Sequence, residues 1–392
     1  MGLFSDQLSK AFSSKKLGDV YRGGDALWAT DFAPSGIAAV DCSLGGGFAR
    51  GRIHELYGNF SSGKTLVLYA TLANNQRLGG ESVLFESEGA YSPDFFRNMG
   101  GDPDKLTLIP ADKVEDVFDG MLAVCKEQEK MIAEAMKTKG ATPMPRLTVI
   151  GWDSIAATGT KHLFDTGMDK RDMSKSGAMS QGTQLVTTAI KECNVCVIGV
   201  NQVREAIGSK DSATHTPGGN AWGFHSSSRV ELMYDGGSRT SLIHDPPAKG
   251  QKPEDFKGRE EIGRWIKGYV VKNKCASPFA KFKLPIYTYP GRPHPEFDRE
   301  TKLGIDIDEM LLTFYLEGRF YLPDGGRVVH VPSAGWYALH PALDPDQQKF
   351  RQSKWPEMLD LLPALRTLPY DIKQSSATTS PGVPEGVPAA TV

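Results

Sequence analysis

Hydrophobic and polar positions follow one another along this chain in a pattern that predicts strands and helices in turn. Short apolar runs predict strands at residues 52–57, 82–85, 106–110, 146–153, 195–202, 229–234 and 269–274. Segments of helical character predict helices at residues 66–73, 114–139 and 179–192. Because strands that alternate with helices form parallel sheets covered on both faces, we expect an α/β fold with a mostly parallel central sheet.

The two ends of the chain depart from this central pattern. Apolar residues at helical spacing predict a short N-terminal helix, namely Leu3, Phe4, Leu8 and Phe12. Its apolar face packs either on its own domain or on a neighbouring copy, and we assign residues 1–33 to an oligomerisation segment. A core domain at 34–290 precedes a proline-rich hinge and a small α/β C-terminal domain at 291–373. Residues 374–392 are rich in Ser, Thr, Pro and Gly and predict a disordered tail.

Composition narrows the class of protein. The chain has 392 residues, of which 40% are hydrophobic and 23% charged, as in soluble globular proteins. The formal net charge is -2, so a nucleic-acid-binding surface would have to be a local basic patch. No signal peptide and no membrane-length apolar run are recognisable, which predicts a cytoplasmic protein with no membrane partner.

Five cysteines without a recognisable signal peptide fit a reducing compartment and no disulfide framework. Cys193 and Cys196 have the C-x-x-C spacing, at the end of a predicted helix and the start of a predicted strand. No second pair accompanies them, so a buried structural pair is favoured over a zinc or redox site.

One stretch between a predicted strand and a predicted helix fits the pattern G-x-x-x-x-G-K-[ST]. It consists of Gly58, Asn59, Phe60, Ser61, Ser62, Gly63, Lys64 and Thr65. The glycines let backbone N–H groups point at phosphate oxygens, and the following helix adds the positive end of its dipole. Lys64 would reach the β- and γ-phosphates and Thr65 would hold Mg²⁺. A chance turn rich in Gly and Ser is the alternative, but the strand before it and the helix after it favour a nucleotide-binding loop.

Polar side chains also follow the other predicted strands. Glu86 and Glu88 follow one strand, Asp153 ends the next, and Asn201 and Gln202 end a third. Each alone would more often be an ordinary strand cap, but the carboxyl ends of parallel strands meet at one edge, where such sheets carry their sites. We therefore expect these groups and the phosphate loop to form a single active site.

With these residues established, the chain from about 34 to 289 resembles the RecA-type recombinases, including the RecA and RadA proteins. The segment from Glu86 to Ala90 resembles an acidic family segment, which implies that Glu88 activates the attacking water. The resemblance also implies that Asp153 lies near Mg²⁺ and that Gln202 senses the γ-phosphate. Phe95 occupies the position of a family aromatic that stacks on adenine.

The segment from Val270 to Phe279 resembles a further family signature, whose two lysines reach the ATP of an adjacent subunit. The resemblance therefore gives catalytic roles to Glu88, Lys64, Gln202, Lys272 and Lys274. The ATP-binding set is the phosphate loop with Phe95 and Asp153, and the metal-binding set is Thr65 with Asp153.

Two loops, at about 160–174 and 204–220, are expected to bind DNA because of the same resemblance. Their candidate contacts are Lys170, Arg171, Met173, Arg204, Lys210, Gly218, Gly219 and Asn220. Cations on backbone phosphates and apolar side chains between bases suit binding that does not depend on sequence. From the residues alone two solvated loops are the alternative, since Asp165, Asp169 and Asp172 balance the cations of the first loop.

Several features depart from the family pattern. The middle of the second loop is polar, at residues 209–212, where an apolar wedge is usual, and Gly223 stands where a lysine is frequent. The helix before Asp153 looks extended, and the tail lacks the acidic residues of bacterial members. These departures indicate a divergent member, for which a bacteriophage origin is one hypothesis.

The leading hypothesis is an ATP-dependent DNA recombinase, a DNA-dependent ATPase that requires ATP and Mg²⁺. It would form a helical filament on single-stranded DNA and exchange strands with homologous duplex DNA in recombination and DNA repair, assisted by single-strand-binding and loader proteins. A hexameric helicase with the same core fold is one alternative, but the signature at Lys272, Asn273 and Lys274 and the lack of a recognisable primase-binding domain argue against it. A mediator paralogue with little ATP turnover is another, although Glu88 and Gln202 are present.

Overall fold

The structure is a computed structural model that describes residues 31–137, 148–167, 174–205, 214–236, 241–246, 260–316, 326–362 and 365. The predicted N-terminal helix and the C-terminal tail lie outside these residues. Four of the candidate DNA contacts also lie outside them, namely Lys170, Arg171, Met173 and Lys210. The described residues from Phe32 onward belong to one compact unit.

A sheet of ten strands forms the centre of this unit. In spatial order, its main path is β5 (Leu106–Pro110), β4 (Glu81–Glu86), β6 (Thr148–Asp153), β7 (Cys196–Gln202), β3 (Ile53–Gly58), β10 (Ser228–Tyr234), β12 (Glu261–Asn273), β13 (Lys281–Tyr287) and β14 (Gly304–Ile305). The short β11 (Leu242–His244) pairs with β12. Pairing is parallel from β5 to β10 and antiparallel from β10 to β14, which confirms the predicted mostly parallel sheet.

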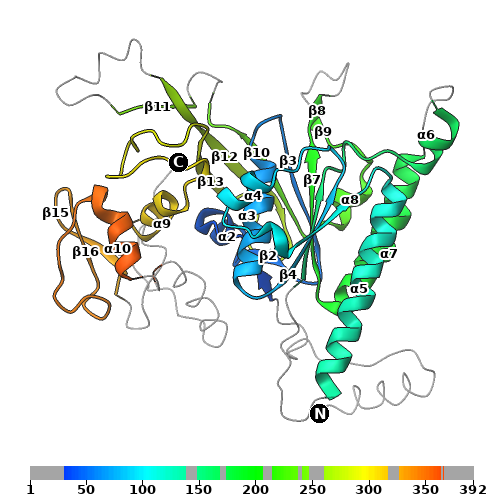
Figure 1. The fold of residues 1–392 in the computed structure, drawn as a ribbon, viewed down its shortest axis with the longest axis horizontal. Coiled ribbons are helices and arrows are strands. Elements are labelled where there is room, and N and C mark those ends of the chain that lie inside the picture. The colour runs from blue at the N-terminus through cyan, green and yellow to red at the C-terminus, as the bar shows by residue number, and fades with distance from the viewer. Residues whose placement is uncertain are drawn as a thin grey trace. The chain divides into compact units, whose positions relative to one another are not determined.

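Helices cover both faces of the parallel part of the sheet (Figure 1). One face carries α2 (Ala38–Leu44), α3 (Lys64–Arg77) and α4 (Pro93–Asn98). The other carries α5 (Val114–Lys137), α7 (Lys175–Cys193) and α8 (Ala221–His225). The apolar side chains form one buried cluster on each face, as the alternation of side chains along a strand requires. The first cluster contains Leu56, Leu84 and Ile198, and the second contains Ile53 and Val83.

Shorter elements complete the described chain. They are β1 (Phe32–Ala33), β2 (Phe48–Ala49), α6 (Lys161–Thr166), β8 (Arg204–Glu205), β9 (Thr214–His215), β15 (Val329–Ser333) and β16 (Trp336–Leu339), with single helical turns at Pro103–Lys105 and Gln352–Lys354. None of the helices in the described part of the chain has the length and apolarity needed to cross a membrane.

Within the described residues, the strands and helices predicted from the sequence are present in the structure, and one of these strands is much longer than predicted. The strand predicted at 269–274 spans Glu261–Asn273, and β13 follows it without having been predicted. The part of β12 before the predicted strand contains Gly263 and Gly268, which hide the alternating pattern. A Cβ at Gly268 would lie 2.1 Å from the Phe282 ring of β13, so tertiary packing explains this glycine.

The thiol that contacts Cys193 is not that of Cys196, its neighbour in the C-x-x-C sequence. Cys193 and Cys196 are both buried, as predicted for a structural pair. The thiol hydrogen-bonded to Cys193 is that of Cys125 on α5, and this bond together with burial raises the pKa of Cys125. Among the described residues, no three or more His, Cys, Asp or Glu side chains come together in a group that could hold a metal ion.

The C-terminal elements pack on the α2 side of the sheet. Helix α9 (Ile307–Leu316) contacts α2 and α10 (Trp355–Leu361), and side chains of all three belong to the same apolar cluster. Trp355 is fully buried and donates its indole N–H to the Asp308 carbonyl at 3.0 Å. The described C-terminal elements therefore share the apolar core on that face of the central sheet.

Candidate active site at the carboxyl edge of the sheet

The stretch from Gly58 to Thr65 joins the end of β3 to the start of α3, as predicted. Its first and last glycines have positive φ angles of 154° and 83°. A Cβ at Gly58 would lie 2.0 Å from the Leu232 carbonyl oxygen, and one at Gly63 would lie 2.6 Å from Ile286 Cδ1. Only glycine fits both positions, so these residues allow the backbone to curl in front of α3.

Lys64 is the first residue of α3 and is buried in this loop. Its ammonium donates to the Asn59 carbonyl at 2.6 Å, and Ser62 Oγ donates to the same oxygen at 2.8 Å. Burial lowers the pKa of Lys64, while the nearby carboxylates of Asp153 and Glu88 act in the opposite direction. An ammonium buried inside this loop is well placed for a polyphosphate.

Thr65 and Asp153 meet across the gap between α3 and β6. The Thr65 hydroxyl donates to Asp153 Oδ2 at 2.7 Å. Burial raises the pKa of Asp153 to about 6, with the charge of Glu88 adding to the effect. A divalent cation beside these two oxygens would offset that burial, and Mg²⁺ commonly takes only one or two protein oxygens and keeps several waters. The residues therefore fit the predicted Mg²⁺ site.

Glu86 and Glu88 have different environments although they are neighbours in the sequence. The Glu86 carboxylate accepts backbone N–H groups of Glu88, Gly89 and Ala90 at 2.9–3.0 Å. It therefore fixes the turn that carries Glu88. The Glu88 side chain is exposed and accepts a short hydrogen bond from Ser154 Oγ, directly after Asp153. Of the two carboxylates, that of Glu86 is engaged by the backbone and that of Glu88 is exposed.

Gln202 lies beside the phosphate loop because β7 pairs with β3, and its register partner is Gly58. The preceding Asn201 is fully buried and donates to Glu55 Oε1 at 2.9 Å and to the Pro217 carbonyl at 3.1 Å. Pro217 lies directly before Gly218 and Gly219, two candidate DNA contacts. The strand next to the phosphate loop thus holds the end of the second predicted DNA loop.

Glu55 is paired with Arg229 at 2.5 Å, and its side chain is 0% exposed. The guanidinium lies over the Tyr57 ring, 4.7 Å from its centroid, and also donates to Thr216 Oγ1 at 3.4 Å. Sequence analysis missed this ion pair. Its signal was an acidic residue in the middle of a strand predicted for a sheet covered on both faces, because a charge buried there requires a partner.

Lys272 and Lys274 do not reach the phosphate loop of their own chain. Arg229 is the register partner of both Lys272 and Glu55, so Lys272 lies at the level of Glu55, before the carboxyl end of β3. Its ammonium donates to the carbonyls of Gly223 and Phe224 at 2.9 and 2.8 Å. Phe224 itself is 71% exposed.

Phe95 lies on α4, beside the first turns of α3. Its ring meets Tyr69 of α3 edge-on at 6.1 Å between centroids. A cavity of about 730 Å³ opens on the other side of the phosphate loop and is lined by Ser61. Two aromatic residues missed by the sequence analysis, Tyr234 and Tyr289, also line it. Arg264, Glu260 and Glu261 also line it, so the cavity combines aromatic rings with charges of both signs.

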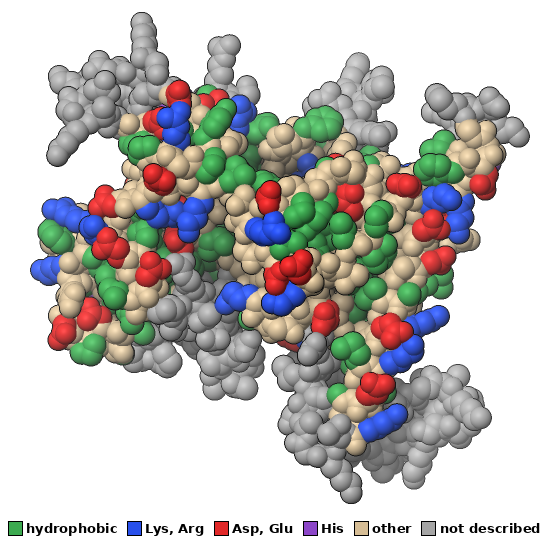
Figure 2. All heavy atoms as spheres, viewed as in Figure 1, with side chains coloured by type: hydrophobic (Ala, Val, Ile, Leu, Met, Phe, Trp, Pro, Cys, Tyr) green, Lys and Arg blue, Asp and Glu red, His purple; other side chains and the backbone are tan. Residues whose placement is uncertain are grey.

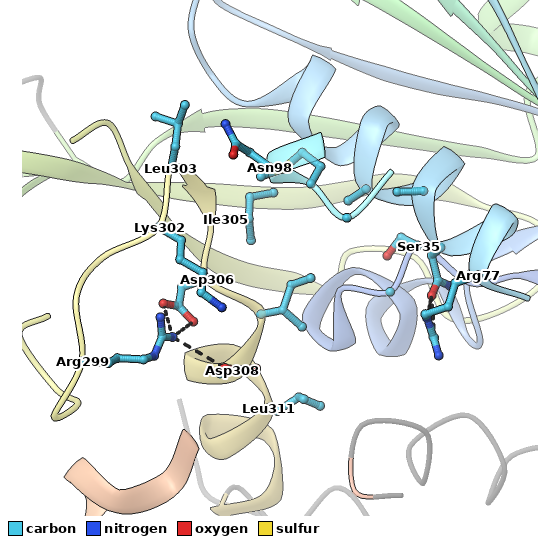
Figure 3. Close-up of a pocket in the computed structure, with 17 residues that line it drawn as sticks. Ser35, Arg77, Asn98, Arg299, Lys302, Leu303, Ile305, Asp306, Asp308 and Leu311 are labelled. Atoms are coloured by element: carbon cyan, nitrogen blue, oxygen red, sulfur yellow. Dashed lines mark hydrogen bonds and ion pairs between the residues drawn. The ribbon is translucent and has the colours of Figure 1, made fainter. Parts of the chain in front are cut away.

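A second cavity, of about 370 Å³, is drawn in Figure 3, and no residue of the phosphate loop lines it. Arg77 lines it at the last residue of α3, about 20 Å from Lys64 at a helical rise of roughly 1.5 Å per residue. Its opposite wall carries Arg299, which donates to both carboxylate oxygens of Asp306. This cavity is separate from the phosphate loop.

The candidate DNA contacts are only partly described. Gly218 and Gly219 have φ angles of 97° and 78°, and Asn220 is exposed. The backbone of Arg204 forms part of β8, but the structure does not describe its side chain. On the face drawn in Figure 2, described Lys and Arg side chains are interspersed with Asp and Glu. The described part of that face therefore carries mixed charge.

A glycine-rich loop between a central parallel strand and a helix, facing acidic strand ends, defines the chain as a P-loop nucleotide-binding protein. The RecA N-terminal domain family matches residues 6–291, and the chain belongs to the RecA family.

Proteins named Protein RecA are similar over most of this chain. That of Ruminococcus albus is 33% identical over 282 residues, which are 70% of this chain and 62% of the relative. That of Nocardioides sp. is 33% identical over 273 residues, 69% of this chain and 68% of the relative. That of Francisella tularensis subsp. novicida is 33% identical over 285 residues, 71% of this chain and 69% of the relative. At such identity the chain is a divergent member of the family.

Proposed function

We propose that the protein is an ATP-dependent DNA recombinase that assembles on single-stranded DNA and pairs it with homologous duplex DNA. Membership of the RecA family and the similarity to proteins named RecA support this function. ATP and Mg²⁺ are the expected cofactors, single-stranded and homologous duplex DNA the expected partners.

One observation carries the proposal. The strand pair β3–β7 places Gln202 beside Gly58 of the phosphate loop, and the adjacent Asn201 holds the Pro217 carbonyl at the end of the second candidate DNA loop. A shift of this strand end with the nucleotide would move the loop. Such a connection is expected of an ATPase whose turnover depends on DNA and is not needed by an enzyme that only hydrolyses ATP.

Hydrolysis of ATP requires charge stabilisation on the phosphates and a group that orients water. In this proposal Lys64 and the loop N–H groups bind the phosphates. Mg²⁺ held by Thr65 and Asp153 would neutralise part of their charge. Glu88 accepts a hydrogen bond from the attacking water and orients it, while Ser154 holds the carboxylate.

Lys272 and Lys274 act in the proposal on the ATP of a neighbouring subunit. They lie away from the phosphate loop of their own chain, so an isolated subunit would lack two cations at the γ-phosphate. Added cations of this kind stabilise the charge of the transition state. ATP hydrolysis would then be efficient only in an assembled filament.

ATP hydrolysis by the full chain, with and without single-stranded DNA, tests this function. Single-stranded DNA should stimulate the wild type. Glu88→Gln should lose about 100-fold or more of the stimulated rate, because a positioned general base contributes roughly 10²–10⁴-fold. Glu192→Gln, an exposed residue on α7, removes the same charge elsewhere and should retain the wild-type rate.

Two outcomes would contradict the proposal. Hydrolysis that is indifferent to DNA would leave an ATPase without the proposed coupling. Closed rings in electron micrographs with ATP and DNA, in place of helical filaments, would favour a helicase.

A further inference from the structure

The turn after β6 is bound to the segment that carries Glu88. Ser154 donates its hydroxyl to Glu88, and its backbone N–H donates to Ser87 Oγ at 3.0 Å. Ser87 Oγ in turn donates to the Ser154 carbonyl at 2.9 Å and lies 3.0 Å from Thr158 Oγ1. The turn at residues 154–158 and the expected water-activating carboxylate therefore move as one hydrogen-bonded group.

Lys175 binds the same turn from the opposite side. Its ammonium donates to the carbonyls of Ile155 at 2.8 Å, Ala156 at 3.3 Å and Thr158 at 2.5 Å. Lys175 is half-buried at the first residue of α7. These three bonds join one ammonium to the turn, so a displacement of this residue would strain or break them.

The position of Lys175 links this turn to both predicted DNA loops. It follows the end of the first loop at Ser174, whose hydroxyl donates at 3.1 Å to Thr160 Oγ1 at the start of the loop. The next residue, Ser176, faces the end of the second loop, because a Cβ at Gly219 would lie 3.1 Å from Ser176 Cβ. A rearrangement of either loop would therefore be transmitted to the start of α7.

We propose that Lys175 is a positioning residue that couples the first DNA loop to the orientation of Glu88. When DNA binds the loop, the start of α7 holds the turn at 154–158, and Ser154 then holds the Glu88 carboxylate in place for catalysis. This inference rests on the proposed function. It adds a second connection between DNA and ATP, beside the one through Gln202.

Lys175→Met removes the ammonium and keeps most of the side-chain volume. The factor by which single-stranded DNA raises ATP hydrolysis should fall about 5- to 100-fold, the range typical of coupling between two sites. Binding of fluorescein-labelled oligo(dT) in the presence of a non-hydrolysable ATP analogue should stay within about threefold, because Lys175 acts on the orientation of Glu88 in hydrolysis, and reciprocal coupling is required of binding free energies but not of catalytic rates. Lys175→Arg keeps the cation and should retain more of the stimulation.

Lys191→Met changes an exposed lysine near the other end of α7 and should behave as the wild type. An equal loss of DNA-free and DNA-stimulated hydrolysis in Lys175→Met would indicate general damage and overturn the inference. A parallel loss of oligo(dT) affinity would make Lys175 a DNA contact and overturn it too. Unchanged stimulation would refute it as well, whereas a wild type without stimulation would instead refute the proposed function.

If Lys175→Met does not fold, as judged by thermal melting, Lys175→Gln takes its place. Its amide can still donate to one or two of the carbonyls but carries no charge. The same loss of stimulation is expected, and stimulation equal to that of the wild type would overturn the inference.

Discussion

At the scale of single residues, the site depends on charges that are buried with partners. Glu55 is enclosed within β3, and its carboxylate is bound by Arg229 and Asn201. Breaking one side of such a pair leaves a charge that can no longer be solvated, which costs more than the pair contributes. The pair therefore specifies how β10 and the end of the second loop sit beside β3.

Arg229→Met should destabilise the protein by about 3–5 kcal/mol, because Glu55 would remain buried without its cation. The midpoint of urea unfolding at neutral pH measures this loss. Lys130→Met breaks an exposed pair with Glu127 on α5 and should cost no more than about 0.5 kcal/mol. Equal effects of the two substitutions would contradict the role given to the buried pair.

At the scale of elements, α5 and α7 pack closely because small residues let them approach the aromatic side chains between them. Phe118 of α5 meets Trp152 edge-on at 5.6 Å between centroids, and Trp152 meets Trp222 at 5.5 Å. Gly182 of α7 faces Phe118, and a Cβ there would lie 2.1 Å from the ring. This glycine is needed for close approach and not for a turn.

Gly182→Ala should destabilise the protein by about 1–3 kcal/mol through overpacking against Phe118. Gly177→Ala on the same helix is the matched control, because Gly177 is exposed and no atom lies within 4 Å of its added Cβ. That substitution should stabilise by roughly 0.5–1 kcal/mol, since alanine favours helix. Thermal unfolding of both variants checks the opposite signs, and a stabilising Gly182→Ala would refute the packing argument.

At the scale of the whole described unit, a buried ionic cluster joins the sheet to α9. His294 accepts the backbone N–H groups of Glu296 and Phe297 at Nδ1, so a neutral ring carries its proton on Nε2. Nε2 lies 3.2 Å from Asp306 Oδ2 and 3.6 Å from Glu309 Oε2.

The two carboxylates of this cluster differ in ionisation. Burial raises the pKa of Glu309 to about 8, and the negative charge of Asp306 adds to the effect. For Asp306, burial is outweighed by the hydrogen bond to His294 and the charge of Arg299, which lower its pKa. Tyr287 of β13 donates to Glu309 Oε2 at 3.1 Å. At neutral pH the cluster therefore contains one protonated carboxyl group.

Glu309→Gln should remove a pH dependence of stability. The unfolded chain loses the Glu309 proton near pH 4.5, whereas the folded chain keeps it to about pH 8, so stability falls as pH rises between these values. Relative to the wild type, the glutamine variant should gain about 1–3 kcal/mol from pH 5 to pH 8 and little above, since one pKa unit corresponds to about 1.36 kcal/mol. Thermal melts across this range measure the difference.

Glu300→Gln provides the control for this experiment. It removes an exposed carboxylate from the same segment and should follow the wild type at every pH. A Glu309→Gln variant whose stability also follows the wild type would show that Glu309 is ionised in the folded protein.

The sequence by itself determined the class of fold and the phosphate loop. Both are local properties, because apolar runs report buried strands and glycines at fixed spacing report a loop that curls around phosphate. It also predicted that Glu88, Asp153 and Gln202 would share an edge, since parallel strands align their carboxyl ends. The proximity of Thr65 to Asp153 and of Gln202 to Gly58 confirms that expectation.

Only the tertiary structure decided which polar groups meet away from the sequence motifs. The pair Glu55–Arg229, the carbonyls bound by Lys175 and the cluster around Glu309 join residues from separate elements. Strand order and register bring these residues together, and neither is encoded in the spacing of a single segment. The tertiary structure also decided the ionisation of buried carboxyl groups. Burial by elements distant in the sequence, and not the residue type, raised the pKa of Asp153 and Glu309.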